Sequence, residues 1–209
     1  MRRQRQLVLF LRAPQRGAVK RRLARAIGDA AAHGFYAATS RALIRATARD
    51  RRWRTVLAVT PDAFARAGRF WPEAGAAPRM GQGPGDLGAR MGRVFATLPP
   101  GPAVIVGSDI PGITPELVAE AFRRLARGEA VFGPAADGGY WLVGLARRRL
   151  AAAAFPRRLF RGVRWSTPHA LADTRANLPK GAEAPALPVL EDVDEALDFA
   201  RAARRLSAP

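Results

Sequence analysis

Short apolar segments alternate along the chain with longer segments in which apolar residues recur at helical spacing. The short segments are uniformly apolar, and they predict strands at 7–11, 56–59, 103–106, 130–132, 140–144 and 186–190. The longer segments predict helices at about 19–31, 33–50, 87–97, 115–127, 168–176 and 194–206. Apolar strands that alternate with helices are typical of a mostly parallel sheet covered on both faces, so the pattern predicts an α/β fold.

One turn changes this picture of a parallel sheet. Asp137-Gly138-Gly139 lies between two of the apolar segments and is typical of a hairpin, so we expect a mixed sheet. The longest irregular stretch is the glycine- and proline-rich segment 72–88, and loops of this length are usually functional or mobile. No internal repeat or low-complexity linker divides the 209 residues, which predicts a single domain spanning 1–209.

Composition excludes several classes of protein. Hydrophobic residues make up 48% and charged residues 25%, which is typical of a globular protein rather than a disordered one. No apolar run is as long as a membrane span, and the apolar stretch near the N-terminus ends at Arg12, so we interpret it as a core strand and not as a signal peptide. We therefore expect a cytoplasmic location. The chain contains no cysteine, which excludes a disulfide framework and thiol chemistry.

The net charge is +18, and arginine supplies 33 of the 35 basic residues. These residues are spread along the predicted helices instead of being concentrated in one arm. The interpretation we favour is solvated helix faces with non-specific attraction to polyanions, without a specific nucleic-acid partner. A basic nucleic-acid-binding protein without catalysis is the rival interpretation.

In open α/β sheets, ligands bind beyond the carboxyl ends of the strands, and unusual residues follow the predicted strands at four places. The first is LRAPQRGAVKRRL, where Gly17 permits close backbone approach and a helix starts near Val19. A helix start beside cations favours a phosphate. The cations are Arg12, Arg16, Lys20, Arg21 and Arg22. An ordinary basic turn between a strand and a helix explains the segment equally well.

The second place is VIVGSDIPGITPEL, in which Asp109 lies between a strand and a helix that Thr114 caps and Pro115 begins. A carboxylate in this position suits a Mg²⁺ or Mn²⁺ ion that bridges phosphate oxygens. The alternative is that Asp109 accepts hydrogen bonds from backbone N–H groups of its own turn.

The other two places carry glycine-rich turns. In GQGPGDLGARMG, Gln82 and Gly83 would contact a base or sugar and Arg90 a phosphate. A helix cap alone also explains Asp86. In FGPAADGGYWLVGL, Asp137 would orient an acceptor or help to hold a metal, with the two glycines allowing a ligand to approach. A plain Asp-Gly turn is the alternative for that segment.

Several other kinds of site are excluded or left open. His33 and His169 lack the spacing of metal ligands, which argues against a zinc site, and no Gly-x-Ser-x-Gly nucleophile elbow occurs. Glu191, Asp192 and Asp194 precede the last predicted helix. They favour its N-terminus electrostatically, and one of them could face the site.

The order and spacing of these segments resemble one family. The segments are APQRGAVKRRL, GQGPGDLGARM, VGSDIPGITPELV, GPAADGGYWLVGL, RGVRWSTPHAL and LEDVDEALD. They are similar to the small bacterial GT-A-like nucleotide-diphospho-sugar transferases that are described as rSAM/selenodomain-associated or arsenosugar-pathway-type glycosyltransferases. Nucleotidyltransferases that load GTP or CTP onto cofactor precursors are more distant relatives.

The resemblance covers most of the chain, and it implies a GT-A fold with a nucleotide over the first strand's loop and a divalent cation, Mg²⁺ or Mn²⁺, near Asp109. The chain departs from the family at Arg12, where a lysine is usual, and at Glu195-Ala196, where Thr-Pro is usual. Many GT-A glycosyltransferases carry an Asp-x-Asp pair, but Ser108-Asp109 has one carboxylate, so a metal would depend more on phosphates and water.

We therefore expect a metal-dependent glycosyltransferase that uses a nucleotide-diphosphate sugar donor and a small-molecule acceptor. The alternatives are a nucleotidyltransferase that loads GTP or CTP onto a phosphorylated small molecule, a non-catalytic relative with a ligand pocket, and the nucleic-acid-binding protein. The donor base, the sugar, the acceptor and the oligomeric state stay open. The expected roles are catalysis for Asp109 and Asp137, metal binding for Asp109, nucleotide or phosphate binding for Arg12, Gly17, Lys20, Arg22, Gln82, Asp86, Arg90 and Ser108, and contact with the acceptor for Gly138, Gly139 and Tyr140.

Overall fold

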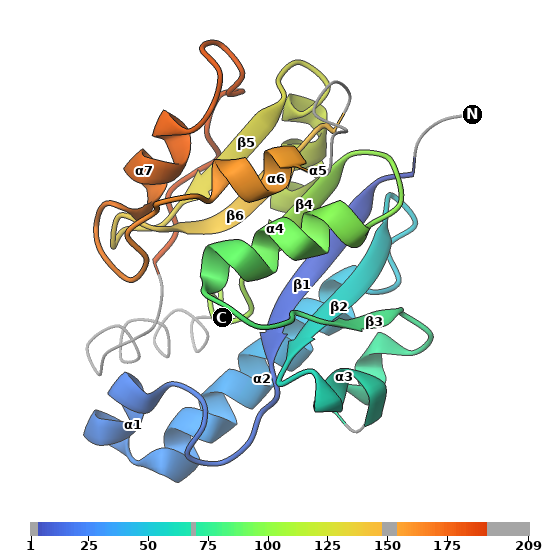
Figure 1. Ribbon diagram of the computed structural model, residues 1–209. Helices are drawn as coiled ribbons and strands as arrows, with labels where there is room; N and C mark the ends of the chain where they lie inside the picture. The colour runs from blue at the N-terminus through green and yellow to red at the C-terminus, as the bar shows by residue number, and fades with distance from the viewer. Residues whose placement is uncertain (1–3, 68–69, 148–153, 192–209) are drawn as a thin grey trace.

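The computed structural model describes residues 4–67, 70–147 and 154–191. The strands are β1 (Gln6–Arg12), β2 (Arg54–Thr60), β3 (Arg79–Gly81), β4 (Ala103–Val106), β5 (Ala130–Pro134) and β6 (Tyr140–Leu145). The helices are α1 (Arg21–Ile27), α2 (Asp29–Thr47), α3 (Ala63–Ala67), the short 3₁₀ helix η1 (Pro72–Ala74), α4 (Leu87–Thr97), α5 (Pro115–Arg124), α6 (Ala154–Leu159) and α7 (Ala170–Ala176) (Figure 1).

The strands form a six-stranded mixed sheet in the order β3-β2-β1-β4-β6-β5. β1 pairs in parallel with β2 and β4, and β3 pairs in parallel with β2. β6 runs antiparallel to both of its neighbours, β4 and β5, which confirms the predicted hairpin. One edge of the sheet therefore contains the carboxyl ends of the other described strands and the amino end of β6. We call it the carboxyl edge.

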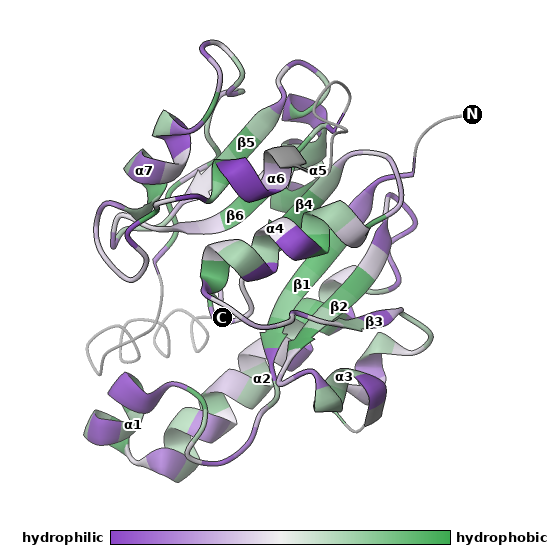
Figure 2. Cartoon of the chain, viewed as in Figure 1, coloured by the Kyte–Doolittle hydropathy of each residue, from purple (hydrophilic) through white to green (hydrophobic). Residues whose placement is uncertain are grey.

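The side chains of the strands fill two hydrophobic cores, one on each face of the sheet. Leu9 of β1 packs in the same core as Ile44 of α2 and Phe122 of α5. The neighbouring Val8 points to the opposite face, where Phe95 of α4 and Leu159 of α6 pack. Figure 1 shows these helix pairs on opposite sides of the sheet, and Figure 2 shows the strands as mostly hydrophobic. The prediction of helices on both faces is thus confirmed.

The predicted strand at 186–190 is wrong. Leu187 and Leu190 donate their N–H groups to carbonyls of β5, Phe132 and Pro134, at 2.8 and 3.1 Å, but only isolated bridges form. Pro185 and Pro188 have no N–H group to donate and interrupt the ladder. The segment therefore runs beside β5 without becoming a strand of the sheet.

The break between the first two helices comes earlier in the chain than predicted, at residue 28 instead of between residues 31 and 33. Gly28 has a φ of 85°, which ends α1 after Ile27 and lets α2 begin at Asp29. α1 also starts two residues later than predicted, at Arg21, and has only seven residues. The predicted attraction of phosphate to this region therefore rests on side-chain cations rather than on a long helix dipole.

Four short elements were not predicted, namely β3, α3, η1 and α6. Each has at most six residues, which is too short to show a clear hydrophobic period. The predicted helix at 194–206 lies outside the described residues. Within the described part of the chain, no helix has both the length and the apolar character needed to cross a bilayer.

Candidate functional site

A pocket of about 520 Å³ opens at the carboxyl edge of the sheet. Its walls come from β1 and the loop after it, from α1 and α2, from the ends of β2 and β6, and from the loop after β4. The segment between β3 and α4 and the first residue of α4 complete them. This volume lies within the range of small-molecule sites, about 300–1,000 Å³. The sheet topology thus brings segments from most of the chain to one cavity.

Lys20 and Asp109 form an ion pair in this pocket. Lys20 Nζ lies 2.9 Å from Asp109 Oδ2, and the side chains are 5% and 37% exposed. The ammonium group is therefore withdrawn from solvent, whereas the carboxylate is partly open to it. Lys20 has left-handed backbone angles, φ 46° and ψ 48°, which are uncommon for a residue with a Cβ atom. The pair connects the loop after β1 to the loop after β4.

A single hydroxyl group organises the backbone beside this pair. Tyr36 Oη accepts a hydrogen bond from the Arg12 N–H group at 2.8 Å and donates to the Arg12 carbonyl at 2.9 Å. Ser108 Oγ lies 3.1 Å from the same oxygen. Burial raises the pKa of Tyr36 to about 12, so the phenol keeps its proton near neutral pH. Tyr36 therefore holds the end of β1 against the loop after β4.

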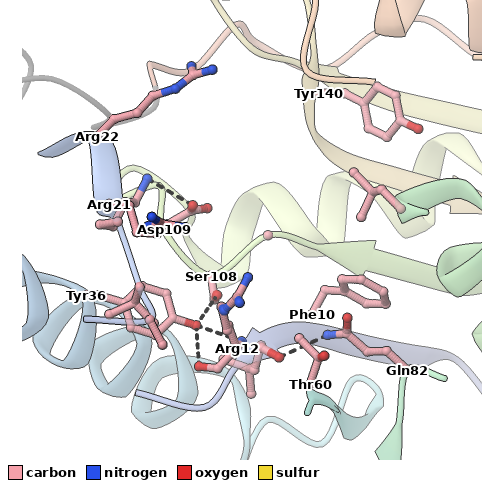
Figure 3. A pocket seen from close by; sticks show the side chains of 16 residues that line it. Phe10, Arg12, Arg21, Arg22, Tyr36, Thr60, Gln82, Ser108, Asp109 and Tyr140 are labelled. Carbon is pink, nitrogen blue, oxygen red and sulfur yellow. Dashed lines mark hydrogen bonds and ion pairs between the residues drawn. The ribbon is translucent and has the colours of Figure 1, made fainter. Parts of the chain in front are cut away.

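The pocket has two chemically different ends (Figure 3). Arg21 and Arg22 lie near Asp109 on one side, and Arg12 projects between the two ends. Phe10, Tyr140 and Gln82 lie on the other side. One end therefore suits an anion, and the other suits an apolar, planar group.

Seven of the predicted site residues line this pocket: Arg12, Lys20, Arg22, Gln82, Ser108, Asp109 and Tyr140. Gly17 belongs to the loop that carries Lys20 but is not part of the lining, and its φ is 72°. The positive φ explains why a glycine stands there.

The two other predicted site residues of the GQGPGDLGARMG segment, Asp86 and Arg90, form hydrogen bonds within that segment. Asp86 caps α4, and its Oδ1 accepts a hydrogen bond from the Ala89 N–H group at 2.7 Å. Arg90 Nε donates to the Gly85 carbonyl at 2.8 Å. Neither residue lines the pocket. The helix-cap interpretation therefore describes the geometry of Asp86, and contact of either residue with a nucleotide stays a prediction.

Asp137 also has the geometry of a turn residue. Its side chain is exposed, and Oδ1 accepts a hydrogen bond from the Gly139 N–H group at 2.8 Å. Gly138 has a φ of 84°, and its carbonyl accepts from the Leu171 N–H group at 3.1 Å. The turn lies at the carboxyl edge just before Tyr140, but Asp137, Gly138 and Gly139 are not part of the lining. A role for these three residues stays a prediction.

Several residues that shape the pocket were not among the predicted site residues. Phe10, Tyr36, Thr60 and Leu87 line it, and each looks in the sequence like an ordinary core or strand residue. Arg93 supports it from outside, because Nη1 donates to the Gln82 carbonyl at 2.7 Å and Nη2 to the Pro84 carbonyl at 3.0 Å. No sequence signal distinguished Arg93 from the other helical arginines.

The oxygen ligands in the pocket suit a divalent cation only together with a phosphate. Asp109 is the one carboxylate in the lining, and no cluster of three or more acidic or histidine side chains suited to a metal occurs within residues 4–67, 70–147 and 154–191. Asp192 and Asp194 lie outside these residues. Mg²⁺ is commonly held by one or two carboxylates, phosphate oxygens and water. Asp109 fits that arrangement, whereas the buried Ser108 hydroxyl lies against Tyr36 and a metal held by protein ligands alone does not fit.

Solved structures share this fold. A "putative nucleotide-diphospho-sugar transferase" from Desulfovibrio desulfuricans G20 is 26% identical, with a TM-score of 0.83 over 97% of this chain and 87% of that chain. The 4-diphosphocytidyl-2C-methyl-D-erythritol synthase of Anaerococcus prevotii DSM 20548 is 10% identical, with a TM-score of 0.60 over 99% of each chain. The chain therefore has a GT-A-like fold, that of the nucleotide-diphospho-sugar transferases.

A third similar structure contains ligands. The glucosyl-3-phosphoglycerate synthase of Mycobacterium tuberculosis, in complex with Mn²⁺, UDP and glucosyl-3-phosphoglycerate, is 16% identical, with a TM-score of 0.54 over 97% of this chain and 76% of that chain. No curated protein matches the chain in sequence. A family model matches residues 43–167, more than half of the sequence, and the chain therefore belongs to DUF2064, a family described as uncharacterized protein conserved in bacteria.

Proposed function

We propose that the protein is a metal-dependent glycosyltransferase that transfers a sugar from a nucleotide-diphosphate donor to a small-molecule acceptor. The observation that carries this proposal is the buried Lys20 paired with Asp109 at the cationic end of the carboxyl-edge pocket. The shared fold with nucleotide-diphospho-sugar transferases supports it. The narrower assignment to the rSAM/selenodomain-associated or arsenosugar-pathway group rests on the sequence resemblance.

The residues of the pocket suit the departure of a diphosphate. Negative charge grows on the leaving diphosphate when the bond to the sugar breaks, and fixed cations stabilise that charge. Lys20 is 5% exposed, and a cation acts more strongly where water is excluded. Arg12, Arg21 and Arg22 add three further cations in the lining. The protein thus contributes position and electrostatics rather than a covalent intermediate.

Asp109 would hold the divalent cation together with the phosphates and water. When bound, Mg²⁺ or Mn²⁺ neutralises charge on the diphosphate. Structures of similar fold contain Mn²⁺ or Mg²⁺, which supports this assignment. Asp109 also orients Lys20, because the two side chains are in direct contact in the structure.

The acceptor would enter beside β6. Tyr140 lines that side of the pocket, and the turn at Asp137, Gly138 and Gly139 precedes it. In this proposal Asp137 orients the acceptor hydroxyl or removes its proton. Its carboxylate is exposed and accepts a hydrogen bond from the Gly139 N–H group, so a bound acceptor can approach it from solvent.

A nucleotidyltransferase that loads GTP or CTP onto a phosphorylated small molecule is the second candidate. Four cations line the pocket against one carboxylate, and this excess also suits a triphosphate and a phosphorylated acceptor. The products separate the two reactions, since sugar transfer releases a nucleoside diphosphate and nucleotidyl transfer releases pyrophosphate.

The test is a thermal-shift screen of nucleoside diphosphate sugars and triphosphates with and without Mn²⁺. A ligand that binds the folded state raises its melting temperature by mass action. We expect a Mn²⁺-dependent increase with at least one nucleoside diphosphate sugar, and we expect Asp109→Asn to abolish that dependence.

The matched control is Asp50→Asn. Asp50 is also an ion-paired carboxylate, 2.6 Å from Arg52, but it precedes β2 at the other edge of the sheet. Its replacement should leave the Mn²⁺-dependent increase intact. An unchanged increase in Asp109→Asn would remove Asp109 from the site and overturn the proposal.

A further inference from the structure

Gln82 is a buried side chain whose hydrogen-bonding direction is determined by the sheet. Gln82 is 2% exposed. Nε2 donates to the Leu11 carbonyl of β1 and to the Ala58 carbonyl of β2, each at 2.9 Å. Both protons of the amide nitrogen therefore have partners. The side chain bridges the ends of two neighbouring strands.

These two contacts exclude the reversed orientation of the amide. If the group were rotated by half a turn, its oxygen would face two carbonyl oxygens, and no proton would be available between them. Oε1 must therefore lie on the side away from these carbonyls. Figure 3 shows it on that side, directed toward Phe10 in the pocket. No hydrogen bond to Oε1 is found among the described residues.

The backbone holds this side chain rigidly in place. The Gln82 N–H group donates to the Val59 carbonyl at 3.2 Å, and Arg93 Nη1 donates to the Gln82 carbonyl at 2.7 Å. The pocket thus contains a preorganised acceptor that offers no donor. A ligand group that provides an N–H at this point gains a hydrogen bond, whereas a second acceptor there is repelled.

The position of this acceptor identifies the part of a ligand that would meet it. Arg21 and Arg22 lie at the opposite side of the pocket, where the phosphates of a nucleotide would bind (Figure 3). Phe10 gives the Gln82 side an apolar, aromatic surface, which suits a planar base. A nucleotide that lies along the pocket would therefore bring its base to Gln82.

We propose that Gln82 selects the base of the nucleotide, and that it favours bases whose ring carries an N–H group. Uracil and thymine have such a group at N3, and guanine has it at N1. Cytosine and adenine have an unprotonated ring nitrogen at the corresponding position, which would face Oε1 as a second acceptor. Their exocyclic amino groups reach Oε1 only if the base shifts from the position in which a ring N–H would bind. The inference rests on the proposed function, because it requires the pocket to bind a nucleotide.

The first test changes the ligand and leaves the protein intact. Calorimetric titrations of the protein with UDP, GDP, CDP and ADP in the presence of Mn²⁺ should show UDP or GDP binding about tenfold or more tightly than CDP and ADP. N3-methyl-UDP and N1-methyl-GDP, which lack the ring N–H, should lose a similar factor. The two methylated nucleotides distinguish uracil from guanine as the source of the N–H group.

Each outcome has a distinct meaning. Equal binding of all four nucleotides, preference for CDP or ADP, or unchanged binding of the methylated nucleotides overturns the base selection and leaves the nucleotide site standing. Binding of none of them overturns the proposed function, and the inference about Gln82 with it.

A second test compares two buried glutamines that lie at opposite edges of the sheet. Gln82→Leu should reduce the preference for UDP or GDP over CDP to less than about threefold, because the oriented acceptor is gone. Gln6→Leu is the control, since Gln6 is 1% exposed but lies at the amino end of β1, at the other edge of the sheet. It should keep the preference of the unaltered protein. A folded Gln82→Leu variant with an unchanged preference overturns the inference, and if this variant does not fold, the methylated nucleotides decide.

Discussion

At the scale of single residues, the buried hydroxyl of Tyr36 joins parts of the chain that are far apart. It contacts both backbone polar groups of Arg12 on β1 and the side chain of Ser108 after β4. A buried group that loses its partner costs roughly 1–3 kcal/mol. The shape of the candidate site therefore depends on a residue that need not touch a ligand.

Tyr36→Phe should lower the free energy of unfolding by about 1–3 kcal/mol, because the Arg12 and Ser108 groups lose their shared partner. Urea unfolding measures this change. Tyr140→Phe is a matched control and should change stability less, since the Tyr140 hydroxyl lies a longer 3.4 Å from the Thr174 hydroxyl. Equal losses in the two variants would contradict the role given to Tyr36.

The raised pKa of Tyr36 predicts that the protein loses stability at alkaline pH. Burial raises the pKa of Tyr36 to about 12, whereas a tyrosine in the unfolded chain ionises near pH 10. Between these values the unfolded state binds fewer protons than the folded state, so the free energy of unfolding falls as pH rises. Ionisation of Tyr36 should lower the free energy of unfolding by roughly 2–3 kcal/mol in total, and no such loss is expected below about pH 10.

Urea unfolding at several pH values between about 9 and 12 tests this expectation. The fall should be smaller in Tyr36→Phe, and the rest is expected from Tyr140, whose pKa is also raised by burial. The chain has two tyrosines, so the ultraviolet absorbance of tyrosinate reports their ionisation directly. Ionisation of both phenols near pH 10 in the folded protein would contradict the expectation.

At the scale of elements, two helices begin where their capping residues predict. Asp86 caps α4 through the Ala89 N–H group, and Thr114 caps α5 through the Leu117 N–H group. A cap is a local signal, because the capping side chain and its partner are three residues apart. These helix starts were therefore readable from the sequence.

The two caps also provide a test of the predicted nucleotide contact of Asp86. Asp86→Ala and Thr114→Ala should each lower the free energy of unfolding by about 0.5–2 kcal/mol, since each removes one capping hydrogen bond. If Asp86 contacts the nucleotide, only its replacement should also weaken nucleotide binding, as measured by calorimetry. Unchanged binding in Asp86→Ala would restrict Asp86 to its structural role.

At the scale of the whole molecule, the net charge of +18 attracts any polyanion, whereas the proposed site in the pocket binds one small ligand. The two interactions differ in their response to salt. Binding to a nucleic acid through many phosphate contacts weakens steeply with salt, because condensed counterions are released. A nucleotide bound in a pocket makes few phosphate contacts and releases few counterions.

We expect binding of a labelled oligonucleotide to fall about 1,000-fold or more between roughly 50 and 200 mM salt. Nucleotide binding in the same buffers should fall much less. Fluorescence anisotropy and calorimetry measure the two affinities. Tight oligonucleotide binding at the higher salt, with no response to any nucleotide, would instead support the nucleic-acid-binding alternative.

Much of the fold was predictable from local pattern. The strand at 103–106 and the helix at 87–97 have the predicted bounds, and the Asp137-Gly138-Gly139 hairpin makes the sheet mixed as expected. The error at 186–190 came from an apolar run that contains Pro188 and directly follows Pro185, and neither proline can complete a ladder. The single domain at 1–209 and the roles of individual site residues stay predictions.

The sequence by itself determined most of the longer strands and helices and which edge of the sheet would carry polar residues, because hydrophobic period, caps and turns act over a few neighbouring residues. The tertiary structure alone decided which of those residues meet. The Lys20–Asp109 pair, the position of Tyr36 between β1 and β4, and the direction of the Gln82 amide all depend on strand order and register. These contacts join distant parts of the chain, and no local pattern encodes which carbonyl or carboxylate a side chain will reach once the sheet has formed.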